Sequence, residues 1–332
     1  MTTTTDSEAR NPVVMDSGPN ASHCPGMTGE SMSKYSSSGP VSLRTNLADY
    51  AMTKTLKSGA VTSDLVRFDF CGPKVANQGF KPMVRERAFD AGELAIGTFL
   101  QAKVYGKPVT LLPAVVMGRF QHQTALRSTQ RPPLGPGDVE GKRVGIRSYT
   151  QTTGIWVRGI LQHEYGVDLN KVTWVCNDDG HLAEYQDPPH VERPPADAKK
   201  VDQMLLDGEL DAAILGAELP NEPRVAHLIP NPKEAALAWY RKYNTVPVNH
   251  LFCVDRDLAD ARPDVVRDIF RMLKESKAAM PPSADGIDFH PFGVAALRKP
   301  LEMMIQYSVE QKIIPRAFTV DELFDDVTRG LA

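Results

Sequence analysis

Short apolar stretches alternate with helical patterns from Val41 to the end of the chain. The strand-like stretches are Val41–Arg44, Leu65–Cys71, Val109–Met117, Arg143–Ile146, Val172–Val175, Ala212–Leu215 and Leu251–Val254. Helical patterns lie between them, near residues 48–57, 78–87, 96–105, 153–166, 200–207 and 234–243. This alternation is typical of an α/β fold with largely parallel sheets and helices on their faces.

The ends of the chain carry further signals. Pro263 opens a helical pattern with Val265, Val266, Ile269, Phe270 and Leu273 on one face. Thr319-Val-Asp-Glu322 is a capping box, so it predicts the start of a last helix. Residues 1–40 are rich in polar residues, Gly and Pro, and we predict a flexible arm or a strap on a partner subunit.

Two segments resemble each other, Phe89–Ile96 and Leu206–Ile214. Each places an acidic turn containing glycine ahead of a strand of small residues, which fits two similar α/β lobes. We predict that lobe I comprises residues 41–118 plus about 281–332, and lobe II residues 119–280. The proline-rich segment 176–200 is predicted to be a long irregular loop that acts as a lid or an oligomer contact.

Charge and composition exclude several classes of partner. The 38 basic and 41 acidic residues leave a net charge of -3, with no long block of one sign, so nucleic acid and anionic membrane are poor partners. Without a spanning apolar run or a signal-like start, the chain is expected to be cytoplasmic. The 4 cysteines are far apart and predict buried or idle thiols. The His23-Cys24 pair lacks further ligands, so no metal site is predicted.

A polar loop follows the predicted strand 143–146. In open α/β sheets ligands collect at the carboxyl ends of strands, where helix N-termini offer free N–H groups. The loop carries Arg147, Ser148, Thr150, Thr152 and Thr153. Arg147 can hold a carboxylate through two hydrogen bonds, and the hydroxyls can satisfy its other lone pairs. The alternative is that Thr152 or Thr153 only caps the helix.

Two histidines and two carboxylates lie near other strand ends. Arg119 and His122 follow the most apolar strand, and His250 precedes a later strand. Histidine suits proton transfer near neutral pH, although a packed imidazole is the simpler interpretation of each. Glu93 and Glu218 occupy comparable positions, where a solvated turn carboxylate is the alternative.

Familiar catalytic motifs are absent from the sequence. Neither G-x-G-x-x-G nor G-x-x-x-x-G-K-[ST] occurs, which disfavours nucleotide binding, and neither G-x-S-x-G nor H-E-x-x-H occurs. The last two absences disfavour the common hydrolases and zinc proteases.

Several ordered motifs resemble the 4,5-dihydroxyphthalate decarboxylase family over roughly residues 41–330. They are Trp156–Val167 with the preceding loop from Gly145, Phe89–Leu94, Phe120-Gln-His122 and Val246–His250. The resemblance implies a two-lobed, type II periplasmic-binding-protein-like fold with mixed sheets, helices on both faces and a ligand cleft between the lobes. It also implies cofactor-free loss of CO2 from an aromatic dicarboxylate, and we expect a homo-oligomer.

The resemblance assigns roles residue by residue. His122 and His250 match family histidines, and we expect one to be the proton donor and the other the partner of a ring hydroxyl. The residues Tyr149, Thr152, Trp156 and Arg158 also match, and we group them with Arg119, Arg147, Ser148, Thr153, Glu93 and Glu218 as substrate-binding candidates. Ser148 replaces an expected acidic residue and Arg147 an expected proline, which puts the substrate in doubt.

Other classes fit the same scaffold. A solute-binding protein for an aromatic carboxylate is the chief alternative, although it would need an export signal. A menaquinone-pathway dehydratase and a pyrimidine synthase of thiamin biosynthesis are further alternatives, because fold alone does not select a chemistry.

Overall fold

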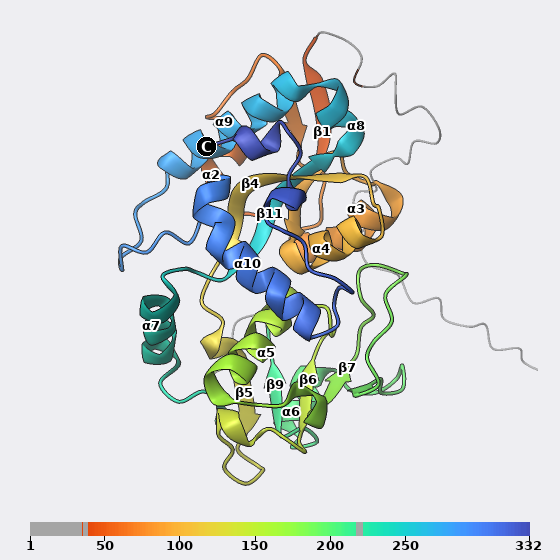
Figure 1. The fold of residues 1–332 in the computed structure, drawn as a ribbon, viewed down its shortest axis with the longest axis vertical. Helices are drawn as coiled ribbons and strands as arrows, with labels where there is room; N and C mark the ends of the chain where they lie inside the picture. The colour runs from red at the N-terminus through yellow and green to blue at the C-terminus, as the bar shows by residue number, and fades with distance from the viewer. Residues whose placement is uncertain (1–34, 36–38, 217–221) are drawn as a thin grey trace, which may run out of the picture.

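The computed structural model describes residue 35 and residues 39–216 and 222–332 (Figure 1). The strands are β1 (Val41–Asn46), β2 (Val66–Asp69), β3 (Ala91–Ala95), β4 (Val109–Gly118), β5 (Ala125–Ser128), β6 (Arg143–Ile146), β7 (Thr173–Cys176), β8 (Val191–Glu192), β9 (Ala212–Ile214), β10 (Val225–His227) and β11 (Val248–Asp255). The helices are α2 (Lys54–Lys57), α3 (Phe80–Glu86), α4 (Ile96–Val104), α5 (Thr152–Tyr165), α6 (Val201–Leu206), α7 (Pro232–Tyr243), α8 (Arg256–Ala261), α9 (Pro263–Ala278) and α10 (Val294–Glu310).

The first sheet has the strand order β2-β1-β3-β11-β4 and forms the centre of lobe I. β1 pairs in parallel with β2 and β3, whereas β11 runs antiparallel to β3 and β4. Helix α9 packs against β2 and β4, and α8 packs against β4 and β11. The buried face of α9 includes Val265, Val266 and Ile269, as its apolar pattern predicts.

The second sheet has the strand order β10-β5-β9-β6-β7-β8 and forms the centre of lobe II. β6 pairs in parallel with β7 and β9, while β5 is antiparallel to β9 and β10. Helix α6 packs on β5, β6 and β9. The polar loop and helix α5 follow the carboxyl end of β6, as the sequence predicts.

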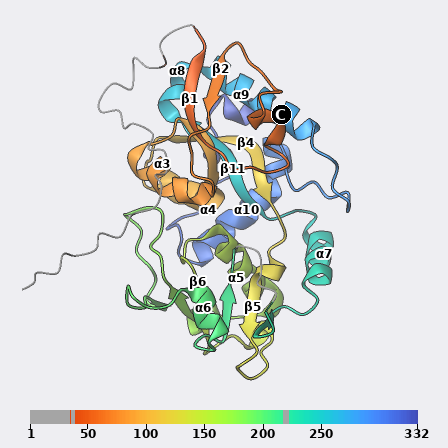
Figure 2. The ribbon, with the colours of Figure 1, turned by 180° about the vertical axis from the view of Figure 1, so that it is seen from behind.

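The chain crosses between the lobes at two adjacent places. It leaves lobe I after β4 and returns before β11, and the N–H of Arg119 donates to the carbonyl of Pro247 at 3.2 Å. Helix α10 lies between the lobes, because it contacts both α4 of lobe I and α5 of lobe II. Figures 1 and 2 show this arrangement from opposite sides.

The predicted lobe boundary needs a correction. Residues 119–280 were all predicted to lie in lobe II, but β11, α8 and α9 pack in lobe I. The reason is that β11 is hydrogen-bonded between β3 and β4, in the middle of the first sheet. Lobe I therefore takes up the chain again at Val248, about thirty residues earlier than predicted.

Two elements near the C-terminus also differ from prediction. α10 was not predicted, because Pro300 in its interior removes a backbone donor and interrupts the expected helical pattern. The capping box at 319–322 does form, with the N–H of Thr319 donating to Glu322 Oε2 at 2.6 Å. Only two short 3-10 turns, Asp321–Leu323 and Thr328–Gly330, follow it among the described residues, so the prediction of a last helix is wrong.

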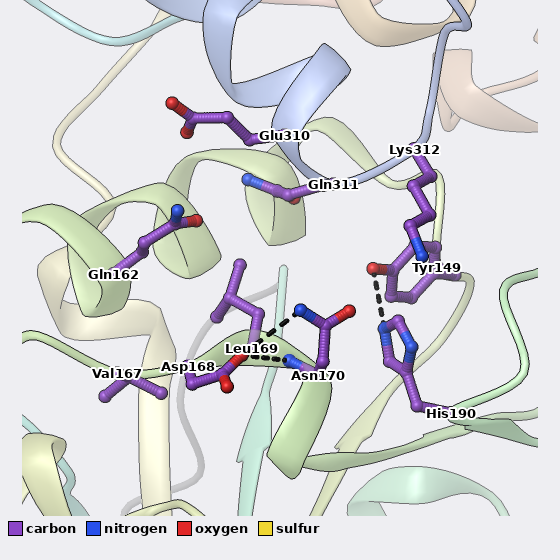
Figure 3. Close-up of a pocket in the computed structure, with 10 residues that line it drawn as sticks. All are labelled: Tyr149, Gln162, Val167, Asp168, Leu169, Asn170, His190, Glu310, Gln311 and Lys312. Carbon is purple, nitrogen blue, oxygen red and sulfur yellow. Dashed lines mark hydrogen bonds between the residues drawn. The ribbon is translucent and has the colours of Figure 1, made fainter.

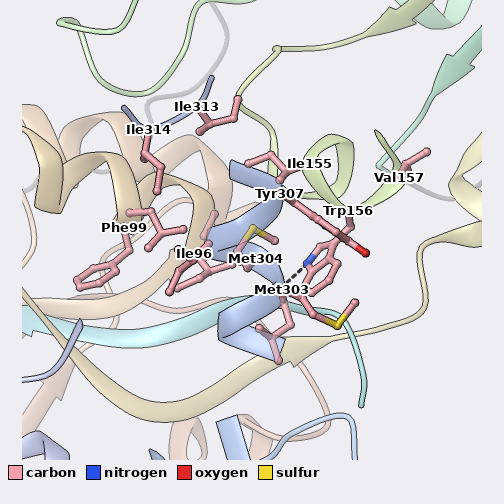
Figure 4. Close-up of a cluster of buried hydrophobic side chains, with 14 of the residues drawn as sticks. Ile96, Phe99, Ile155, Trp156, Val157, Met303, Met304, Tyr307, Ile313 and Ile314 are labelled. Carbon is pink, nitrogen blue, oxygen red and sulfur yellow. Dashed lines mark hydrogen bonds between the residues drawn. The ribbon is translucent and has the colours of Figure 1, made fainter. Parts of the chain in front are cut away.

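The Trp156–Leu161 motif is part of the core between the lobes (Figure 4). The indole N–H of Trp156 donates to the carbonyl of Val248 at 2.8 Å, which ties α5 to the start of β11. Gly159 lies against Tyr307 of α10 so closely that a Cβ there would be 2.2 Å from the tyrosine ring. The motif that carries the family resemblance most strongly is thus a packing motif.

Two further observations concern the described residues. No helix among them is long and apolar enough to cross a membrane. Cys176 and Cys253 are free and buried, whereas Cys71 is disulfide-bonded. The prediction of idle thiols is therefore wrong for Cys71.

Candidate functional site

Glu93 lies in the middle of β3 with its side chain fully buried. Its Oε1 accepts the N–H of Ala48 at 2.7 Å, and its Oε2 accepts the hydroxyl of Tyr50 at 3.0 Å. Both donors come from the loop after β1, which runs parallel to β3. The alternative of a solvated turn carboxylate is therefore wrong, because the segment predicted as a turn is the strand itself.

His250 completes the set of donors around Glu93. β11 runs antiparallel to β3 and places His250 opposite Ala95. The Nδ1 of His250 lies 2.5 Å from Glu93 Oε2, and the side chain is 13% exposed. Because an ionised carboxylate can only accept, Nδ1 carries the proton and Nε2 faces away from the pair. This is the arrangement of an oriented imidazole that exchanges protons through Nε2.

Tyr50 supports the pair as a permanent donor. Burial, followed by the negative charge of Glu93, raises the pKa of the Tyr50 hydroxyl well above its usual range. Tyr50 therefore stays protonated and keeps one lone pair of Glu93 occupied. Glu93 is fixed from three directions, and it can only serve to orient His250 and to offset its charge.

A second imidazole, His181, also contacts the ring of Phe80. The Phe80 ring meets His250 edge-on at 5.1 Å between ring centroids and His181 at 5.6 Å. The Nδ1 of His181 shares a hydrogen bond of 2.7 Å with the hydroxyl of Thr98 on α4. Burial, followed by nearby cations of which Arg147 is the first, lowers the pKa of His181 to about 3, so the ring is neutral. His181 comes from the loop predicted at 176–200, where the sequence pattern gave no sign of a site residue.

The N-terminus of α5 faces lobe I. The helix begins after Gln151, whose side chain makes no capping bond, and the first-turn N–H groups of such a helix attract anions. Thr152 accepts the N–H of Gly97 at 3.1 Å, and Thr153 accepts the side-chain N–H of Asn249 at 3.3 Å. These hydroxyls join the lobes, so the alternative that they only cap the helix is wrong.

Arg119 is the half-buried cation beside this helix end. Its Nη2 donates to the carbonyl of Gly216 at 2.6 Å, while its Nε is buried without a partner among the described residues. Gln151 Nε2 lies against Gly216, so Arg119 and the start of α5 meet there. Burial lowers the pKa of Arg119, and the Tyr50 hydroxyl opposes that shift. An unpartnered guanidinium N–H is suited to a ligand carboxylate.

Arg147 and Ser148 occupy the loop before α5. Arg147 is 39% exposed and pairs with Asp178 at 3.2 Å. The buried Ser148 hydroxyl lies 3.3 Å from that of Thr150. Arg119, predicted only as a substrate-binding residue, therefore keeps an unpartnered donor among the described residues, whereas Arg147, predicted to hold a carboxylate, is already paired.

Tyr149, Trp156 and Arg158 lie beneath the loop and not on its surface. Arg158 is fully buried, stacks on the Tyr149 ring at 4.0 Å and donates to the Tyr149 carbonyl at 2.6 Å. Its Nε donates to Gln311 of the segment after α10 at 2.8 Å. These residues hold the loop in shape, which explains why they match a family pattern without facing a ligand.

His122 lies in the core and is not joined to His250. It belongs to the turn His122–Thr124 and is 2% exposed, with its ring against Trp239 of α7 at 6.2 Å. Burial lowers its pKa to about 4, so it is neutral near pH 7. This placement matches the simpler interpretation of a packed imidazole.

We predict that His122 makes the fold sensitive to acid. The unfolded chain takes up a proton near pH 6.5, whereas the folded chain resists it down to about pH 4. The stabilisation is complete above pH 6.5 and is lost as the pH falls, by about 2 kcal/mol between pH 7.5 and 5. Urea unfolding at the two pH values should show this extra loss in the wild type and not in His122→Phe. Equal losses would contradict the burial of His122.

A small cavity lies apart from these residues, on the far side of Tyr149 (Figure 3). It is lined by Tyr149, Gln162, Val167, Asp168, Leu169, Asn170, His190, Glu310, Gln311 and Lys312. The Tyr149 hydroxyl and His190 Nε2 share a hydrogen bond of 3.2 Å there. Tyr149 thus faces this cavity and His190, not the Glu93 cluster.

Two predictions concern residues that the structure does not describe. Glu218 and the His23-Cys24 pair lie outside the described residues. Within residues 39–216 and 222–332, no group of three or more His, Cys, Asp or Glu side chains is arranged to hold a metal ion.

Comparison with known proteins agrees with the resemblance seen in the sequence. No family model matches the chain. The chain is 26% identical over 212 residues to a 4,5-dihydroxyphthalate decarboxylase of Comamonas testosteroni, covering 58% of this chain and 62% of the relative. It is 29% identical over 174 residues to the Pseudomonas putida protein of that name, covering 47% and 65%. The matched region spans less than two thirds of either relative.

Solved structures share the fold at low identity. The periplasmic aliphatic sulphonate-binding protein of Escherichia coli has a TM-score of 0.53 at 12% identity, covering 86% of this chain and 92% of that one. The alkanesulfonate-binding protein of Xanthomonas axonopodis pv. citri has a TM-score of 0.53 at 13% identity, covering 87% and 99%. A mutant of DSZB in complex with biphenyl-2-sulfinic acid has a TM-score of 0.51 at 13% identity, covering 86% and 97%. The chain therefore has the predicted two-lobed, periplasmic-binding-protein-like α/β fold, and about half of it is similar in sequence to proteins named 4,5-dihydroxyphthalate decarboxylase.

Proposed function

We propose that this protein catalyses the non-oxidative decarboxylation of an aromatic dicarboxylate, 4,5-dihydroxyphthalate or a related phthalate. The observation that carries the proposal is the buried Glu93–His250 pair, which holds an imidazole with its Nε2 free to donate a proton. The names of the two relatives support the same reaction. The half-buried Arg119 and the N-terminus of α5 provide positive potential suited to a carboxylate.

The reaction needs one proton at a ring carbon. A hydroxyl para to the departing carboxylate gives up its proton and pushes electrons into the ring. The carbon that bears the carboxylate then takes a proton, and a dienone forms. The carbon–carbon bond breaks, CO2 leaves, and the bonding electrons restore the aromatic ring and the hydroxyl, which regains a proton. The net change replaces one carboxylate and one proton by a C–H bond and CO2.

The residues of the site divide these tasks. His250, as the imidazolium, donates the proton from Nε2, and Glu93 offsets the charge of that imidazolium. Arg119 and α5 hold the carboxylate that stays on the ring. A strong cation on the departing carboxylate would stabilise the substrate more than neutral CO2 and would slow the reaction. The two predicted roles of proton donor and anion holder thus fall on separate elements, β11 and α5.

A solute-binding protein for an aromatic carboxylate is the second candidate. The structures that share the fold include two sulphonate-binding proteins, and an anion site at a helix N-terminus would serve binding as well as catalysis. The buried Glu93–His250 pair distinguishes the two, since ligand capture alone does not need an oriented proton donor. Residence in the cytoplasm and assembly into a homo-oligomer stay predictions from the sequence.

Incubation of the purified protein with a panel of phthalates tests the proposal. We expect CO2 release from 4,5-dihydroxyphthalate and slower or no release from phthalate, which lacks the electron-donating hydroxyl. Calorimetric titration with the same compounds should run beside the assay. Binding of the panel without CO2 release would support the solute-binding protein and overturn the decarboxylase. Metal content measured in the same sample tests the prediction that no cofactor is needed.

A further inference from the structure

The loop between β7 and β8 starts in lobe II and is held by lobe I. Its residues Gly180, His181 and Leu182 are buried, although much of the surrounding loop is exposed. Arg85 on α3 donates from Nε to the carbonyl of His181 at 2.6 Å and from Nη2 to that of Gly180 at 3.0 Å. Figure 2 shows the loop rising from lobe II towards α3. One arginine thus fixes the peptide groups on both sides of His181.

The side chain of His181 is fixed in the same way as that of His250. Thr98 occupies the Nδ1 of His181, and Glu93 occupies the Nδ1 of His250. Both rings stand edge-on to Phe80, and neither Nε2 has a hydrogen-bond partner among the described residues. The two imidazoles therefore contact the same aromatic side chain, each with a ring nitrogen that has no partner among the described residues.

We propose that His181 is a specificity-determining residue whose Nε2 hydrogen-bonds a ring hydroxyl of the aromatic ligand, and that Arg85 is the positioning residue that holds it there. This rests on the proposed function for the identity of the ligand. A neutral imidazole with a fixed Nδ1 suits a neutral hydroxyl, whereas the carboxylates find their partners at Arg119 and α5. Loss of a buried hydrogen-bond partner rejects or weakens a ligand far more than a small change in apolar contact does.

Hydrogen exchange in the free protein tests the role of Arg85 without any ligand. In Arg85→Met, the amides of residues 180–184 should exchange about tenfold faster, which is the effect of losing about 1.4 kcal/mol of charge-assisted hydrogen bonding. In Arg85→Lys the exchange rates of the same amides should lie between those of the wild type and Arg85→Met. Lys107→Met is the matched control, because it removes the exposed ion pair of Lys107 with Glu184 on the same loop at 2.5 Å. Unchanged exchange around His181 in Arg85→Met would overturn the positioning role.

Ligand selectivity tests the role of His181. By calorimetry, the wild type should bind 4,5-dihydroxyphthalate more tightly than phthalate. His181→Phe should lose that preference by about tenfold while its affinity for phthalate is kept. A preference that survives in His181→Phe overturns the inference. If the wild type binds 4,5-dihydroxyphthalate more tightly than phthalate but releases no CO2, only the proposed function is overturned. If the wild type binds neither compound, the assignment of the ligand fails for both proposals, and hydrogen exchange still decides the role of Arg85.

Discussion

Replacement of His250 by asparagine should lower the rate of CO2 release from 4,5-dihydroxyphthalate by about a hundredfold or more, which is the usual worth of a general acid. The imidazole is held by Glu93 at 2.5 Å from Nδ1, and no other histidine in the described residues shares this carboxylate. Asparagine can still donate to Glu93 but cannot carry a proton to carbon. Single-turnover measurement of CO2 separates this loss from any change in binding.

The matched control for His250 is the other buried histidine that the family pattern selects. His122→Phe should keep most of the activity at pH 7.5, because His122 packs against Trp239 and has no link to Glu93. The rate of CO2 release by Glu93→Gln should lie between those of the wild type and His250→Asn. Glutamine keeps a hydrogen bond to the imidazole but does not offset the imidazolium charge. Equal losses in His122→Phe and His250→Asn would show that the proton donor has been assigned wrongly.

Replacement of Arg119 by methionine should raise the dissociation constant for phthalate about tenfold to a hundredfold. The buried Nε has no partner in the described residues, so a ligand carboxylate can gain a charge-assisted bond worth about 1.5–3 kcal/mol. Methionine keeps the length of the side chain and removes the donors. Calorimetry gives the dissociation constant independently of turnover.

Arg147→Met is the matched comparison for Arg119. Arg147 is 39% exposed and already pairs with Asp178, so its loss should change the dissociation constant by about threefold or less. A larger effect at Arg147 than at Arg119 would support the sequence-based prediction that Arg147 holds the ligand carboxylate. The carboxylate would then be assigned to a place near Asp178 and His181.

The main elements of both sheets could be predicted because their apolar runs are short and clearly bounded. β6 matches its predicted residues Arg143–Ile146, and α5 begins within one residue of prediction. The order of the strands could not be predicted, because periodicity says nothing about partners far apart in the chain. β11 joins lobe I through contacts with β3 and β4, more than 130 residues away, and this is why the lobe boundary was misplaced.

The site could be predicted only in part, because the sequence pattern does not show which distant residues meet in the fold. Strand-end reasoning found Glu93 and His250 separately, but the sequence does not show that antiparallel pairing of β3 and β11 brings them together. Tyr50 and His181 lie in irregular segments and carry no periodic signal. Glycine at position 92 was taken as a turn residue, whereas its φ of 146° and its approach to Asn46 serve a close contact between β1 and β3.

The family motif around Trp156 shows how a specific pattern can mislead about roles. Trp156, Arg158 and Gly159 each have a structural partner, namely the carbonyl of Val248, the carbonyl of Tyr149 and the ring of Tyr307. These residues match the family pattern because they support the polar loop before α5. Arg158 Nη1 is also buried without a partner among the described residues, but Arg119 differs in that it meets the start of α5 at Gly216.

Decarboxylation of 4,5-dihydroxyphthalate in D2O, followed by NMR of the product and by trapping of CO2, tests the proposed reaction most directly. The account predicts one CO2 per substrate and one deuterium at the vacated ring carbon. In His250→Asn the rate of this reaction should fall by about a hundredfold or more. Binding of the compound without CO2 release, or equal rates of CO2 release by the wild type and His250→Asn, would contradict it.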